Sequence, residues 1–222
     1  MLSLLATVAL AQSPPVAAEM HERFSHTMQI RQHLIQGDLE EARKLAATLV
    51  DPTPVEGLPA GWATATAKLH TEATALSKAT DVGVAAKHLS QLASACAECH
   101  ALTDGGPGLD GMRGVPPQQW SEGDNMPLHL WAVDWMWLGL VAPNDEAWDR
   151  GVAELDSKPL AAMFGENEPT AQKLEKQVYA LAKKAGELGP AKHTERAAIM
   201  GELLATCATC HVLRDQKSDD KK

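Results

Sequence analysis

The sequence is poor in aromatic residues, in cysteine and in long apolar runs. Its 222 residues include six Trp, two Phe, one Tyr and only four Cys. No apolar stretch approaches the roughly 20 residues that a helix needs to cross a bilayer, so no membrane span is expected. Runs of β-branched residues are few, whereas alanine is abundant, and this composition favours helices. The length suits one large domain or two small ones.

Positive charge is also in deficit. The chain has 20 Lys and Arg against 29 Asp and Glu, a formal net charge of −9. Nucleic-acid-binding proteins need a basic patch to meet phosphates, so nucleic acid is not an expected partner. An acidic surface would suit a basic protein partner, or would simply keep the protein soluble.

All four cysteines fall in two copies of one pattern. Cys96-Ala97-Glu98-Cys99-His100 and Cys207-Ala208-Thr209-Cys210-His211 are C-x-x-C-H runs, the attachment pattern for a c-type haem. Two thiols at this spacing add to the two vinyl groups of one porphyrin, and the adjacent His binds the iron as proximal ligand. The sequence therefore predicts two covalently attached haem c groups, with His100 and His211 on the irons.

Paired cysteines have two other common uses besides haem attachment. A structural zinc site could take four cysteines. Zinc, however, would not require a His directly after both second cysteines, and the two pairs lie 111 residues apart. A redox-active C-x-x-C is the second alternative, but the βαβ pattern that usually surrounds it is not visible. The motif thus favours haem.

The first eleven residues, MLSLLATVALA, are typical of the apolar region of a secretory signal. Ala9, Leu10 and Ala11 form the pattern at which such signals are cleaved. The basic residues that normally precede the apolar region are missing, so we expect a signal truncated or misassigned at its start. The expected location is the periplasm or another exported site, with a mature chain that begins near Gln12. A retained N-terminal anchor is the alternative.

The chain repeats itself. Met20–Leu49 aligns with Met126–Leu155, an offset of 106 residues, so that a helix, a turn and a new helix start recur. The two C-x-x-C-H runs are offset by 111 residues, which gives the second copy about five more residues. The alternative is that two unrelated helical stretches share a few apolar positions. The duplicated motif favours a true repeat.

Each copy is predicted to contain four helices, because apolar residues recur at spacings of three and four. Asp38 and Asn144 have the positions of N-caps. The fourth helix is expected to begin at about Val82, the first helix of the second copy at Met126, and the last helix is expected at about 194–213. Residues 103–124 are rich in Gly and Pro and predict a linker. The expected organisation is a signal at 1–11, a first haem-binding bundle at 12–102, this linker, and a second haem-binding bundle at 125–222.

The place of each motif indicates the kind of cytochrome. Only eleven residues follow His211 and none is Met or His, so any distal ligand of the second haem lies upstream. A helix can present Cys, Cys and His to one haem, since positions i, i+3 and i+4 share a face. On these two motifs and the helix order, the chain resembles class II cytochromes of the cytochrome c-prime type.

This resemblance implies several properties. The fold class would be all-α, with two tandem four-helix bundles that each carry C-x-x-C-H near the end of the last helix. Haem would lie between helices, with its distal side facing the first helix. Attachment outside the cytoplasm and association of two chains into a homodimer are also implied. The chain departs from the usual single bundle by being doubled.

Candidate distal ligands lie near the start of each copy's first helix, beside the end of the fourth helix in an up-down bundle. The candidates are Met20, His21, His26 and Met28 in the first copy, and Met126 and His129 in the second. Only Met20 and Met126 share an aligned position, 80 and 85 residues before their proximal His. His129 lies one turn beyond Met126 and competes with it. Met ligation, His ligation and an open five-coordinate iron all stay as hypotheses.

The main functional hypothesis is a periplasmic dihaem cytochrome that carries electrons between redox partner proteins, and so is not an enzyme. Closed six-coordinate iron exchanges an electron without binding a substrate, and the sequence has no convincing acid–base constellation. The alternatives are a haem protein that binds or senses small gaseous ligands and a peroxidase-like haem enzyme. Both require an open distal site, and the enzyme also requires distal acid–base groups.

Overall fold

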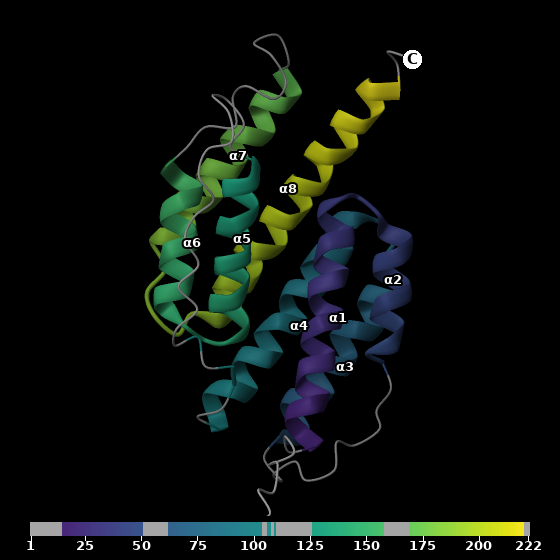
Figure 1. Ribbon diagram of the computed structural model, residues 1–222, viewed down its shortest axis with the longest axis vertical. Coiled ribbons are helices and arrows are strands. Elements are labelled where there is room, and N and C mark those ends of the chain that lie inside the picture. The colour runs from purple at the N-terminus through teal and green to yellow at the C-terminus, as the bar shows by residue number, and fades with distance from the viewer. Residues whose placement is uncertain are drawn as a thin grey trace, which may run out of the picture.

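Figure 1 shows the computed structural model, which describes residues 15–50, 62–103, 106, 107, 109, 126–157 and 169–219. These residues form eight helices and no strand, so the all-α prediction is confirmed. None of these eight helices is long and apolar enough to cross a membrane. The predicted signal at 1–11 and nearly all of the predicted linker lie outside the described residues.

The helices form two sets of four, and in each set the chain direction alternates (Figure 1). In the first half these are α1 (Pro15–Ile35), α2 (Leu39–Thr48), α3 (Ala63–Ser77) and α4 (Val82–Thr103). The second half contains α5 (Met126–Val141), α6 (Asp145–Ser157), α7 (Pro169–Gly186) and α8 (His193–Asp219). In both halves consecutive helices pack together, and the first helix also contacts the fourth.

Both predicted N-caps are present. The Asp38 carboxylate accepts a hydrogen bond from the backbone N–H of Glu41 at 3.2 Å and begins α2. The Asn144 side-chain oxygen accepts one from the N–H of Ala147 at 2.8 Å and begins α6. Each cap satisfies a backbone donor that the first turn of a helix leaves without a partner. The repeat is therefore visible in local structure as well as in the two motifs.

The two halves pack through α4 and α8, whose contact is one of the two most extensive between helices. Gly201 on α8 makes a close approach possible, since a Cβ there would lie 3.2 Å from Lys87 Cα and 3.4 Å from Ser90 Oγ. Position 201 is 111 residues after 90, the same offset as between the motifs. Equivalent positions of the two halves thus meet where the helices cross.

The helices α4 and α8 run in opposite directions, so their C-terminal ends lie at opposite ends of the molecule (Figure 1). Each motif begins six residues after the crossing at Ser90 and Gly201. At a rise of 1.5 Å per residue, Cys96 and Cys207 lie roughly 9 Å to either side of it along the axes. The antiparallel packing separates the two motifs.

One apolar core runs through both halves. Ile30 and Leu34 on α1 and their repeat equivalents on α5, Met136 and Leu140, are all fully buried in it. These residues pack with buried leucines of α4 and α8. Burial of apolar area is the main stabilising contribution to folding, and here it joins the halves as well as building each one.

Candidate haem sites

Each C-x-x-C-H run lies on the wall of its own cavity. The first cavity, of about 430 Å³, is lined by Cys96, Cys99 and His100 at the end of α4. Most of its other lining residues are apolar and come from α1, α3 and the ends of α2 and α5; they include Phe24, Trp62, Leu69 and Val141.

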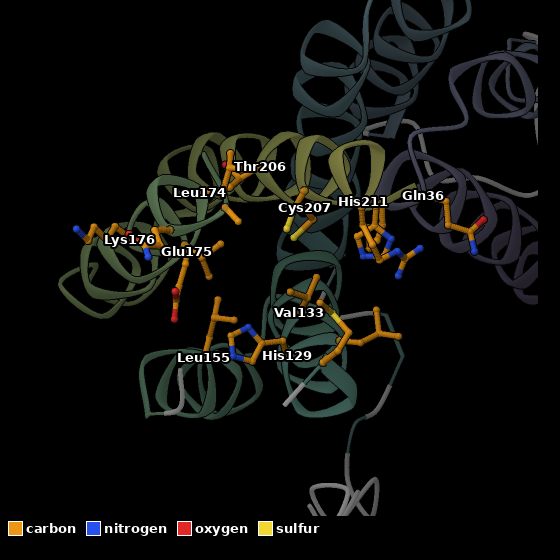
Figure 2. A pocket seen from close by; sticks show the side chains of 18 of the residues that line it. Gln36, His129, Val133, Leu155, Leu174, Glu175, Lys176, Thr206, Cys207 and His211 are labelled. Carbon is orange, nitrogen blue, oxygen red and sulfur yellow. The ribbon is translucent and has the colours of Figure 1, made fainter. Parts of the chain in front are cut away.

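The second cavity, of about 510 Å³, has the corresponding place in the other half. Cys207, Cys210 and His211 at the end of α8 line it, together with residues of α1, α5, α6 and α7. Figure 2 shows Cys207 and His211 on α8 across the cavity from His129 and Val133 on α5. Both volumes fall within the roughly 300–1,000 Å³ that is usual for cofactor sites.

The four cysteines are free thiols, and none is fully exposed. Burial raises the pKa of Cys96 and of Cys207 to about 12, and the second thiol of each motif adds to the shift. Burial also raises the pKa of Cys99 and of Cys210. Redox-active C-x-x-C pairs depend on a thiol whose pKa is lowered. These thiols are therefore poorly suited to disulfide exchange.

The zinc alternative finds no support in the described part of the chain. It contains no group of three or more His, Cys, Asp or Glu placed to hold one metal ion. A structural zinc ion takes four such ligands in a tetrahedron. The two cysteine pairs lie in separate cavities and do not share a site. What the motifs do share is two thiols and an imidazole on the wall of a largely apolar cavity, the donor set that covalent haem requires.

The proximal candidate His100 is held from the other half. Its Nδ1 lies 2.8 Å from the backbone carbonyl oxygen of Val141, the last residue of α5. Because a carbonyl can only accept, Nδ1 must carry the proton and donate it. That tautomer leaves Nε2 with a lone pair for a metal, the usual arrangement of a ligating His.

The distal candidates differ in their placement. Met20 lines the first cavity, and Met126 lines the second, so the aligned pair occupies equivalent places. His129 also lines the second cavity and is 5% exposed. His26 is not among the residues that line the first cavity; its Nδ1 lies 3.2 Å from the Thr48 hydroxyl. The exposed His21 does line that cavity.

The first helix of each half contributes to both cavities. The start of α1 lines the first cavity, and its last turn contributes Gln32 and Ile35 to the second, together with Gln36, which directly follows the helix. In the same way α5 begins at the second cavity and ends with Val141 in the first. Ile35 and Val141 are equivalent positions, 106 residues apart. Each site is thus completed by the opposite half.

Sequence reasoning did not identify these contributions across the interface. The Val141 carbonyl carries no sequence signal, since any residue supplies one. Gly106, which packs against the His100 ring, lies in a stretch that was predicted only as linker. Arg31 did have a signal: a charge beside Ile30 and near Leu34, in an otherwise apolar stripe of α1.

Comparison of the chain with protein-family models, with curated proteins and with solved structures found no match. The assignment of the two sites therefore depends on the motifs and on the geometry around them.

Proposed function

We propose that this protein is an exported, periplasmic dihaem c-type cytochrome that transfers electrons between redox partner proteins. One observation carries the proposal: both C-x-x-C-H runs line mostly apolar cavities of cofactor size, and Met20 and Met126 line them at equivalent positions. A chance motif would not be expected to occur twice with the same surroundings.

Each residue of the two motifs would have a defined role. Cys96 and Cys99 hold the first haem and Cys207 and Cys210 the second, while His100 and His211 bind the irons. When bound, haem supplies an iron that cycles between the ferric and ferrous states. The apolar walls keep water away, which favours fast electron exchange with little rearrangement of solvent. A Met from α1 or α5 would close each iron and raise its potential relative to a second His.

The test is to make the full chain in a bacterial host with c-type haem maturation and to export it through a supplied secretory signal. We expect two covalent haems per chain by the pyridine haemochrome assay and by intact mass. Low-spin spectra in both oxidation states that do not change with carbon monoxide would support an electron carrier.

Two full-length control variants, Cys96→Ala/Cys99→Ala and Cys207→Ala/Cys210→Ala, should each lose one haem and keep the other. A colourless wild-type product would overturn the proposal. Two haems with high-spin iron that binds carbon monoxide would instead favour the gas-binding or peroxidase-like alternatives, because both need an open position on the metal.

A further inference from the structure

Arg31 is a buried cation at the interface between the two halves. It lies on α1 with 3% of its side chain exposed, and one guanidinium nitrogen pairs with the Asp134 carboxylate on α5. Another nitrogen donates to the Val133 carbonyl oxygen at 3.5 Å, and the guanidinium carbon lies 5.7 Å from the ring centroid of Trp137. Arg31 belongs to the first half of the repeat, and its three partners belong to the second half.

The two charges of this pair are not equally screened. Asp134 is 40% exposed, so water screens its negative charge, whereas Arg31 is shielded from water. The Nε of Arg31 is buried and has no hydrogen-bond partner among the described residues. The interior near Arg31 is therefore electropositive in spite of the ion pair.

Arg31 lies near the second motif. Its charge lowers the pKa of the Cys207 thiol, against the larger effect of burial, and Asp134 is not among the groups that shift that pKa. Its neighbours Gln32 and Ile35 on α1, and Gln36 just after the helix, line the second cavity. The repeat equivalent of Arg31 is the uncharged Trp137, so the first site receives no equivalent charge from across the interface. Arg23, which acts on Cys96, comes from the first half itself.

We propose that Arg31, held between Asp134, Val133 and Trp137, raises the reduction potential of the second haem from across the interface. This inference rests on the proposed function. In the step concerned, one electron leaves the redox partner, which is oxidised, and reduces ferric iron to ferrous iron. The haem site gains one negative charge, and a buried cation nearby stabilises that product. Arg31 would thus act through its charge, as a positioning residue, and need not touch the iron.

The experiment compares redox titrations of the full-length dihaem protein and of four variants. Arg31→Met removes the charge at similar volume, and Arg31→Lys keeps it. Asp134→Asn leaves the Arg31 charge uncompensated. Arg43→Met, at an exposed position on α2 where Nε bonds the Ser77 carbonyl oxygen at 3.0 Å, is the matched control. The variants that lose one cysteine pair assign each reduction step to its haem.

The expected result is a pair of opposite shifts confined to the second haem. Arg31→Met should lower its potential, Asp134→Asn should raise it, Arg31→Lys should restore most of the wild-type value, and Arg43→Met should change nothing. If Arg31 and Asp134 had a purely structural role, both substitutions would shift the potential of the second haem in the same direction, or would shift the potentials of both haems together. Either outcome, or no shift at all, overturns the inference.

The two proposals fail in different ways. A protein without haem contradicts the proposed function, whereas a dihaem protein with unshifted potentials contradicts only the role of Arg31. If Arg31→Met does not fold or bind haem, the shift in Asp134→Asn decides, since that substitution keeps the shape of the side chain and removes the partly exposed charge that pairs with Arg31. No rise in the second potential in that variant would overturn the inference.

Discussion

Gly106 packs directly against the imidazole of His100. A Cβ at position 106 would lie 2.9 Å from His100 Cγ and 3.1 Å from Nδ1, and the backbone φ of 115° is one that residues with a side chain rarely adopt. The ring is therefore held on one side by this glycine and at Nδ1 by the Val141 carbonyl. The position of His100, the proposed proximal ligand, thus depends on segments that follow it in the chain.

Substitution of Gly106 by Ala should disturb the first site alone. Strain at such a backbone position costs on the order of 1–3 kcal/mol, and here the new methyl group would also displace the His100 ring. We expect a lower potential or a partial high-spin signal at the first haem, with the second unchanged. Gly189→Ala is the control, because nothing lies within 4 Å of that Cβ. Equal effects of the two substitutions would contradict the expectation.

Gly37→Ala should act on the second site. The turn between α1 and α2 has φ of 80° at Gly37, and a Cβ there would lie 2.6 Å from Val212 Cγ2, next to His211. We expect the free energy of unfolding to fall by about 1–3 kcal/mol. Urea unfolding measures this change, and the spectrum of the second haem should be altered while that of the first is kept. A change at the first haem only would argue against the close packing of Gly37 on Val212.

Single alanine substitutions would assign the distal ligands. We expect Met20→Ala to convert the first haem to a high-spin form that binds carbon monoxide. Either Met126→Ala or His129→Ala should do the same to the second. His26→Ala should leave both low-spin, because His26 does not line the cavity and its ring lies beside Thr48. Visible and electron paramagnetic resonance spectra would show the change, and loss of the low-spin signal in His26→Ala would contradict the assignment.

In the haem-free chain, the thiols of Cys96 and Cys207 should react slowly with alkylating reagents. With the pKa of Cys96 and Cys207 at about 12, the thiolate that reacts with iodoacetamide is scarce at pH 8. Their alkylation rate should rise about tenfold per pH unit from pH 8 to 10, in proportion to the thiolate fraction. Peptide mass mapping would give the rate at each cysteine, with the urea-unfolded chain as reference. A plateau below pH 9 would show that the folded thiols are not buried as described.

His193, the first residue of α8, should make stability depend on pH. Its pKa is lowered, first by burial and then by the neighbouring positive charge of Arg196. The unfolded chain then takes up a proton at higher pH than the folded chain does. His193 should therefore cost no stability above about pH 7. The free energy of unfolding should fall as the pH drops through about 6.5 towards the folded pKa.

The measurement is urea unfolding between pH 7.5 and 5. His193→Asn should have a shallower pH dependence in this range than the wild type, whatever its stability at pH 7.5. If the slope is unchanged by the substitution, another group is responsible.

Much of the helical structure could be predicted from local patterns. Asp38 and Asn144 cap α2 and α6 as expected, and the predicted starts at Val82 and Met126 agree with α4 and α5. The last helix was expected at 194–213 and extends to Asp219, since its polar end has no apolar periodicity to reveal it. The lining of the two cavities by Met20 and Met126 at equivalent positions agrees with bundle geometry, whereas the place of His26 outside the lining of the first cavity depends on the rotation of α1.

The two motifs, the repeat and most of the helices could be predicted from local sequence, because thiol spacing, capping and apolar periodicity are properties of neighbouring residues. The crossing of α4 and α8 at Ser90 and Gly201 could not be predicted in this way, nor could the place of Ile35 and Val141, each of which lines the other half's cavity. Those contacts join residues more than a hundred positions apart or depend on backbone atoms. Periodicity shows which face of a helix is apolar, but the partner of that face is selected by packing of the whole chain.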